Sequence, residues 1–299
     1  MKPTKLSTFY VDVYRPRRQP SGKRGTAKNY LATLAHFQKY LDRDPHLEDL
    51  IENTLHGFRA WLVAKPELGN VTVNFHITRL LTLARYAFRK GVLDEEPDVH
   101  PLQEPKRVPV AFRVNQISKM LESATLTPGR IGEIAACDWW MAFIQVLYWT
   151  GLRKGAALAI EQANVDRQGS FVLVFAETQK QNADQVFRLP ADCMVAIEVI
   201  WEPPRRLLFP WPHSDSTFYV HFRRLLTKAE LPSSRRDLCH KIRRTTYSYS
   251  KLGGIDAGHQ LGHHSDQSAR YEDPTITQQR QAADVLPSPT LPKPRLRVI

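Results

Sequence analysis

The sequence predicts a mainly α-helical protein of two domains, with a small antiparallel β-sheet in the second, α+β domain. Three observations support this fold class. Apolar residues recur at spacings of three and four along most of the chain, as in amphipathic helices. Residues 171–189 instead combine β-branched and aromatic residues around a polar turn. Prolines at four-residue intervals separate the two parts near residue 100.

The first domain, residues 1–95, is expected to consist of four short helices. Thr26 is the expected N-cap of the second helix, and Gly91 follows the fourth where a left-handed C-cap would end it. The apolar residues of the four helices are, in order, Leu6, Phe9, Tyr10 and Val13; Tyr30, Leu31, Leu34, Phe37 and Leu41; Leu55, Phe58 and Leu62; and Val73, Ile77, Leu80, Leu81, Ala84 and Phe88, in a helix that begins near Thr72.

Residues 96–112 are expected to form an extended linker, because prolines recur there without a helical stripe. The second domain, residues 113–275, has helical patterns over 115–124, 131–149, 192–201, 217–229 and 237–252, and a helix-like turn after Gly151. A hairpin is predicted to pair 171–176 with 185–189. Residues 276–299 are expected to be a proline-rich basic tail, in which Ile276, Val285 and Leu286 are candidates for docking on a neighbouring protomer.

The charge of the chain favours an anionic partner. Its 299 residues include 42 Lys and Arg against 30 Asp and Glu, a formal charge of +12. Residues 1–107 hold 18 basic and 12 acidic residues, and residues 108–299 hold 24 and 18, so both parts are basic. Two basic domains on one linker suggest a clamp in which both halves meet phosphates, with simple solubility as the alternative.

The sequence indicates a cytoplasmic protein without a membrane partner. The longest apolar stretch, from Trp139 to Trp149, is interrupted by Gln145 and falls short of the roughly 20 residues that span a bilayer. The N-terminus has no continuous apolar region of the kind found in secretion signals. The three cysteines, Cys137, Cys193 and Cys239, are far apart and fit neither a disulfide framework nor a CxxC metal site.

Several side chains are suited to binding a phosphate. Arg153 follows the turn in TGLR, and a rigid arginine there could bind a phosphate with two hydrogen bonds. Lys180 is at the tip of the predicted hairpin, and His240 and Arg243 are three residues apart on one helix face. Taken singly, each has an ordinary structural explanation as an ion-pair partner or a solvated surface group.

Two further candidates follow toward the C-terminus. Gly262 interrupts a helical pattern and would leave His263 at a helix end, where an imidazole can donate a hydrogen bond to an anion. Tyr271 lies among polar and charged residues, which is an unusual place for a core aromatic.

In this order and spacing, the set resembles the catalytic residues of the tyrosine recombinases, the phage integrase family. The likeness covers nearly the whole chain: the helical N-terminal part resembles the family's core-binding domain, and residues from about 110 to 275 its catalytic domain. The resemblance assigns Arg153 and Arg243 as the two arginines, Lys180 as the hairpin lysine, His240 and His263 as the two histidine positions, and Tyr271 as the nucleophile.

The resemblance implies strand cleavage by the tyrosine hydroxyl, with a 3′-phosphotyrosyl intermediate and a free 5′ hydroxyl. Two arginines would stabilise charge on the non-bridging oxygens of the transition state. Lys180 would protonate the leaving 5′ oxygen, and His240 would act as base or acid at the tyrosine. Because the ester retains the energy of the broken bond, no ATP, metal or other cofactor is expected.

The chain departs from the family pattern at three places. Ala156 stands where the family usually has an acidic residue. The stretch from Arg243 to His263 is about three residues short, close to one helical turn. The stretch from His263 to Tyr271 is about one residue short, which keeps His264 as a second candidate for the role of His263.

Other kinds of site fit the sequence less well. His259 and His263 lie in HQLGH, which lacks the glutamate of the HExxH zinc motif, and neither a P-loop nor a GxGxxG motif occurs. Three functions remain: a site-specific recombinase that assembles as a tetramer on double-stranded DNA, a type IB topoisomerase-like enzyme, and a DNA-binding relative with weakened catalysis. All three place the protein at the nucleoid.

Overall fold

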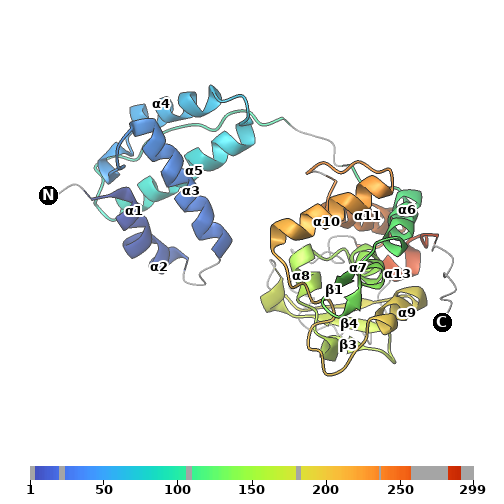
Figure 1. The fold of residues 1–299 in the computed structure, drawn as a ribbon. Coiled ribbons are helices and arrows are strands. Elements are labelled where there is room, and N and C mark those ends of the chain that lie inside the picture. Colours follow the sequence, from blue (N-terminus) through green and yellow to red (C-terminus); the bar gives the residue numbers. More distant parts are fainter. Residues whose placement is uncertain are drawn as a thin grey trace. The chain divides into compact units, whose positions relative to one another are not determined.

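The computed structural model describes residues 4–19, 24–105, 110–179, 183–235, 237–256 and 282–290. The chain divides into two compact units, Met1–Arg107 and Val108–Ile299. As predicted, it is mainly helical, with small antiparallel sheets in the second unit (Figure 1). None of the described helices combines the length and apolar character needed to cross a bilayer.

All the regular elements described in the first unit are helices. Its first helical stretch comprises α1 (Leu6–Thr8), a π-helical segment (Phe9–Tyr14) and α2 (Arg15–Arg18), and is followed by α3 (Arg24–Leu41), a 3₁₀ turn (Leu47–Asp49), α4 (Glu52–Val63) and α5 (Asn70–Arg89). The predicted N-cap at Thr26 is wrong, because α3 already begins at Arg24. Gly91 has a φ of 67° just after α5, which confirms the left-handed residue expected there.

Aromatic rings form much of the core of the first unit. Tyr10 and Tyr30 stack with their ring centroids 4.9 Å apart, and Phe37 meets Phe58 edge-on at 5.0 Å. These contacts join the first helical stretch, α3 and α4, and each of the four rings is at least nine-tenths buried. The aromatic residues therefore stabilise the packing of these three helical segments against one another.

Residues 96–105 contain no helix, but they pack on the first unit rather than only leaving it. Val99 is buried in its core. The side-chain amide of Asn74 donates to the Leu102 carbonyl at 2.9 Å, and its oxygen accepts from the Leu102 N–H at 2.8 Å. At the other end of the predicted linker, Phe112 is fully buried in the core of the second unit.

A buried histidine makes the first unit sensitive to acid. His76 is 7% exposed, and its Nδ1 lies 2.9 Å from Oγ1 of Thr33. Burial, followed by the charges of His36 and Arg79, lowers the pKa of His76 to about 4. The unfolded chain, with a histidine pKa of about 6.5, therefore binds the proton more readily, and stability falls as pH drops from 6.5 to 4, by up to about 3 kcal/mol.

The measurement is amide hydrogen exchange in α3 and α5 at pH 7 and pH 5, expressed as protection factors. Protection is expected to fall at pH 5 in the natural protein and to fall less in His76→Gln, which cannot take up a proton there. Equal losses in the two proteins would contradict this origin of the acid sensitivity.

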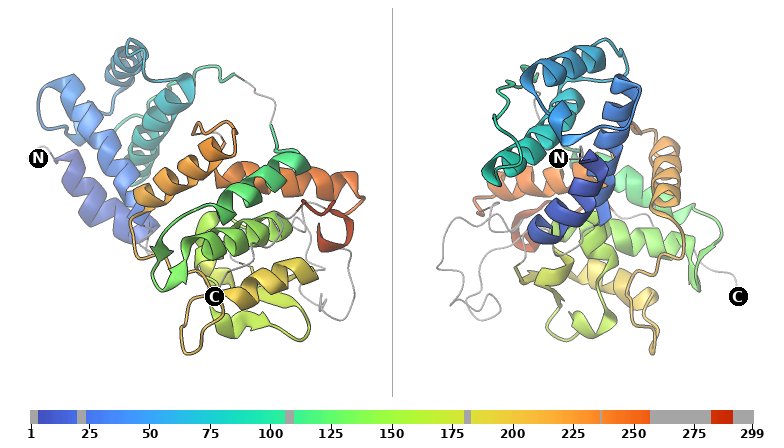
Figure 2. Two further views of the ribbon diagram at one scale, coloured as in Figure 1. Left: turned by 45° about the vertical axis from the view of Figure 1, so that its right-hand side comes forward. Right: turned by 90° about the vertical axis from the view of Figure 1, so that its left-hand side faces the viewer.

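The second unit is built around one buried helix, α7 (Ala136–Thr150), which packs against α6 (Val114–Thr125), α9 (Ala191–Val199) and α11 (Cys239–Leu252) (Figure 2). The helix was expected to begin near residue 131. Instead, β1 (Arg130–Ile131) and β2 (Ile134–Ala135) form a short hairpin, in which Gly132 has a φ of 59°. The left-handed turn prevents α7 from starting earlier.

The predicted hairpin is confirmed. β4 (Phe171–Val174) pairs antiparallel with β5 (Gln185–Arg188), with Phe171 opposite Arg188 and Val174 opposite Gln185. A third strand, β3 (Val165–Asp166), adds to the other edge of β4 and was not predicted. The remaining elements are α8 (Lys154–Leu158), α10 (Asp215–Lys228), and 3₁₀ turns at Gln162–Asn164 and Ala176–Thr178.

The segment 282–290, expected in a tail outside the core, packs on its own unit. It starts with α13 (Ala282–Val285), and the following Leu286 is 6% exposed (Figure 1). The Tyr148 hydroxyl donates to the Pro287 carbonyl at 2.8 Å, and the Thr290 N–H donates to Oγ of Ser118 at 2.7 Å. Leu286 therefore belongs to the core of its own unit and Val285 lies against Gly253, whereas Ile276 lies outside the described residues.

Candidate active site

The TGLR segment forms a tight turn that places a half-buried arginine at the start of a helix. α7 ends at Thr150, and Gly151 takes the left-handed conformation with a φ of 66°. Oγ1 of Thr150 donates to the Val146 carbonyl at 2.6 Å and accepts from the Leu152 N–H at 3.1 Å. These bonds fix the turn, so Arg153, the N-cap residue of α8, starts from a rigid backbone.

The helix α11 brings a second arginine to this turn. Arg243 is 5% exposed, and its Nη1 donates to the Gly151 carbonyl at 2.6 Å. One turn further along α11, Oγ1 of Thr246 donates to the Tyr148 carbonyl at 2.7 Å. Two bonds therefore attach α11 to the end of α7 and bring Arg243 beside the turn that carries Arg153.

The two arginines are close enough to influence each other. Burial, followed by the charge of Arg153, lowers the pKa of Arg243 to about 10. A guanidinium with this pKa still carries its charge at neutral pH. Two like charges held close together attract an anion, and two guanidinium forks match the oxygens of a phosphodiester.

His240 lies on the same helix, three residues before Arg243. Burial of its ring, followed by the charges of Arg243, Arg244 and Arg153, lowers its pKa. The residue as a whole remains exposed, so a ligand can reach it. A neutral imidazole beside two guanidiniums can accept a proton from a hydroxyl group that attacks a bound phosphate.

Three of the six predicted site residues, Arg153, His240 and Arg243, thus meet at the junction of α7, α8 and α11. Lys180, His263 and Tyr271, together with the alternative His264, lie outside the described residues.

The structure does describe Gln179, the residue next to Lys180. Its buried amide donates to the carbonyls of Val174 and Ala183, at 3.2 and 2.9 Å, across the two arms of the hairpin.

The position of Ala156 is apolar. Its side chain is 4% exposed on α8 and belongs to the core of the second unit.

Cys239, immediately before His240, is also buried. Burial raises the pKa of its thiol to about 12, so the thiol is inert as a nucleophile. Within the described ranges, no group of three or more His, Cys, Asp or Glu side chains could hold a metal ion.

The structure adds two cationic neighbours that the sequence analysis missed. The charge of Arg244 helps to lower the pKa of His240. Arg244 follows His240 by four residues on α11, and this spacing could have shown from the sequence that the two lie on the same helix face. The ammonium of Lys154, beside Arg153, forms a 2.7 Å ion pair with Asp215 and lies 4.6 Å from the ring centroid of Tyr219. No sequence signal joins Lys154 to α10, because that contact arises from tertiary packing.

Comparison with known proteins gives the same family as the motifs. The phage integrase SAM-like domain family matches residues 8–100, most of the first unit. Tyrosine recombinase XerC of Mycobacterium sp. is 26% identical over 161 residues, covering 52% of this chain and 53% of that protein. Tyrosine recombinase XerD of Listeria innocua is 24% identical over 211 residues, covering 68% and 67%. The chain is thus similar in sequence to curated tyrosine recombinases and, over most of its first unit, to the phage integrase SAM-like domain family.

Solved integrase structures share its fold. A lambda integrase tetramer bound to a Holliday junction matches with a TM-score of 0.63 and 16% identity, covering 92% of this chain and 79% of the integrase. The Tn1549 transposon integrase in complex with transposon right end DNA matches with a TM-score of 0.69 and 14% identity, covering 92% and 100%. The aligned part covers about half or less of the length of several curated tyrosine recombinases.

Proposed function

We propose that this chain is a site-specific DNA recombinase that cleaves and rejoins strands of double-stranded DNA through a 3′-phosphotyrosyl intermediate. The observation that carries the proposal is the adjacency of Arg153 and Arg243, with His240 beside them. Two charged guanidiniums can bind the non-bridging oxygens of one phosphate and stabilise the charge that grows on them in the transition state.

In the proposed reaction, the phenol oxygen of Tyr271 forms a bond to phosphorus and gives its proton to His240. The bond from phosphorus to the 5′ oxygen breaks, and this oxygen takes a proton from Lys180. His263 or His264 adds a hydrogen bond to the phosphate. Rejoining reverses these steps with the 5′ hydroxyl of another strand, so the number of phosphodiester bonds is conserved without ATP.

The two units are proposed to hold DNA between them as a clamp, and four copies to assemble on recombining DNA at the nucleoid. The basic excess in each unit supports the clamp. Structures of the related lambda integrase include a tetramer bound to a Holliday junction. A topoisomerase-like enzyme would act as a monomer, so sedimentation of the protein with and without DNA distinguishes the two functions.

The test of the function is the capture of a covalent complex. Nicked duplexes made from the DNA that flanks the gene are incubated with the protein, and complexes that survive SDS are measured. A recombinase is expected to leave protein attached to the 3′ end of the cut strand.

The buried Ala156, which stands where the family usually has an acidic residue, favours one alternative function, a DNA-binding relative with weakened catalysis. Tight DNA binding without any covalent complex would support that alternative.

DNA affinity is expected to fall steeply with salt. Each phosphate contact releases counterions, so six to ten contacts would reduce the affinity about 10³- to 10⁵-fold between 50 and 200 mM salt. Fluorescence anisotropy with a labelled duplex measures the slope of log affinity against log salt concentration. A nearly flat dependence would contradict binding by a two-unit clamp.

A further inference from the structure

The catalytic helix α11 has a second face, which is turned into the protein and carries an ion pair. Lys241 lies between His240 and Arg243 in sequence, yet its side chain is only 7% exposed. Its Nζ donates to Oδ1 of Asp237 at 2.8 Å, and the Asp237 side chain is 13% exposed. The proposed mechanism uses neither residue, so the buried pair requires a separate explanation.

The pair connects the chain before α11 to the first turn of the helix. Leu238 occupies the N-cap position and offers no side-chain acceptor to the free N–H groups of that turn. Asp237 instead reaches forward to Lys241, and its Oδ2 accepts from the hydroxyl of Ser234 at 2.5 Å. Burial alone would raise the pKa of Asp237, but the hydrogen bonds from Lys241 and Ser234 lower it overall, so the carboxylate is charged.

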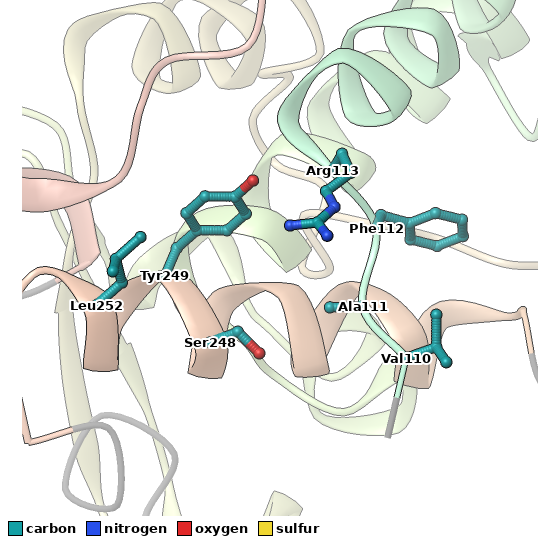
Figure 3. A pocket seen from close by; sticks show the side chains of 7 residues that line it. All are labelled: Val110, Ala111, Phe112, Arg113, Ser248, Tyr249 and Leu252. Carbon is teal, nitrogen blue, oxygen red and sulfur yellow. The ribbon is translucent and has the colours of Figure 1, made fainter. Parts of the chain in front are cut away.

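The same face of α11 is attached to the first residues of the second unit. The Lys241 ammonium lies 4.3 Å from the ring centroid of Phe112, which is fully buried. The Phe112 N–H donates to Oγ1 of Thr245 at 2.8 Å, one turn after Lys241. Figure 3 shows the segment Val110–Arg113 beside the helix, where Arg113 and Tyr249 point toward each other across a pocket of about 390 Å³.

A buried ion pair is a poor source of stability, because desolvation of both charges offsets their attraction, and apolar side chains of similar size often serve as well. What a buried pair can provide is a defined geometry, since each charged group has few places where its hydrogen bonds are satisfied. Here the pair lies at the first turn of α11, and His240 and Arg243 lie on the other side of the helix.

We propose that Asp237 and Lys241 are positioning residues, which hold the first turn of α11 against Phe112 and thereby set His240 and Arg243 beside Arg153. This inference rests on the proposed function for its effect on catalysis. Its structural part, the placement of His240 among the arginines, can be measured in the protein without DNA. A failure of the positioning role is therefore distinguishable from a failure of the proposed function.

The test is the double variant Asp237→Asn/Lys241→Met, which removes both charges and leaves the net charge unchanged. In the folded full-length protein, NMR titration is expected to show the pKa of His240 rising toward its ordinary value of about 6.5, as the arginines lose their fixed positions around it. A His240→Gln variant assigns the signal. Covalent complex formation is expected to slow at least about 10-fold, with DNA affinity changed less than about threefold.

The matched control is the exposed pair of Lys119 and Glu230, whose side chains are 52% and 85% exposed in the same unit. Lys119→Met/Glu230→Gln removes the same two charges and is expected to leave the His240 titration unchanged. The single variant Lys241→Arg keeps the ion pair. It is expected to retain most of the natural His240 pKa and most of the natural rate of covalent complex formation. Unchanged His240 titration in the folded double variant, or an equal change in the control, overturns the proposal.

If the double variant does not fold, Asp237→Glu provides the same test. It keeps both charges but lengthens the acidic side chain by one methylene, so the pair can form only if the first turn of α11 shifts. The pKa of His240 is expected to move in the same direction. An unaltered titration in this variant also overturns the proposal. Should the natural protein form no covalent complex, the proposed function fails, while the titration still decides the positioning role.

Discussion

Replacing Arg243 by lysine is expected to slow covalent complex formation by at least about 100-fold while DNA affinity changes only modestly. The guanidinium is buried, donates to the Gly151 carbonyl at 2.6 Å and presents its remaining nitrogens in a fixed plane. Lysine offers a single ammonium on a flexible stem and cannot bond to the carbonyl and a phosphate in the same geometry. Single-turnover kinetics on a nicked duplex measures the loss.

The control for this substitution is Arg206→Lys, because Arg206 pairs with Glu161 and its side chain is 70% exposed. The exposed change should leave the rate of complex formation unaltered, since surface ion pairs contribute little. Thermal unfolding of both variants separates a loss of chemistry from a loss of folded protein. A folded Arg243→Lys protein that reacts within about threefold of the natural rate would remove Arg243 from the proposed site.

Replacing Tyr271 by phenylalanine is expected to abolish the covalent complex and leave DNA binding nearly intact. The substitution deletes only the oxygen that is proposed to bond to phosphorus, so the proposed ester cannot form. Gel electrophoresis in SDS detects the complex, and anisotropy measures binding. The amount of covalent complex is expected to fall to the background of the assay.

Tyr247→Phe is the matched control, because Tyr247 is 40% exposed on α11 and also lies in the second unit. It is expected to form the complex at the natural rate. The assignment of the nucleophile would be wrong if Tyr271→Phe still formed the complex, or if Tyr247→Phe lost it.

The helices were predictable from sequence where one apolar stripe defines them. The stripe of α5, from Val73 to Ala84, and the turn at Gly91 are local features, and both have the predicted form. The start of α7 was placed too early because its apolar pattern continues back into β1 and β2, where the left-handed Gly132 decides the backbone. Periodicity alone does not distinguish a buried helix from a short apolar hairpin.

Elements stabilised by distant partners were missed or misassigned. β3 is two residues long and exists because Val165 pairs with Val172 of β4. Proline-rich composition suggested a tail for residues 282–290, yet Leu286 fills part of the core and Tyr148 binds the Pro287 carbonyl. Composition describes what a segment can do alone, whereas these contacts depend on the rest of the fold.

The candidate site was predictable to the extent that its residues form motifs. Arg153 and Arg243 are 90 positions apart in sequence, and motif order alone suggested that they meet at one site. The bond from Arg243 to Gly151 supplies the physical link. The pair of Asp237 and Lys241 could not be predicted, because its burial depends on Phe112, which is far away in sequence.

The central claim is that one phosphodiester is attacked by Tyr271 at a site built from Arg153, His240 and Arg243. Its most direct test is to map the residue that carries DNA after the complex is trapped and digested with nuclease and trypsin. Cleavage after Arg270 and Arg280 releases YEDPTITQQR, which contains a single tyrosine, Tyr271. Mass spectrometry is expected to find the nucleotide adduct on that tyrosine. An adduct on any other residue would contradict the account.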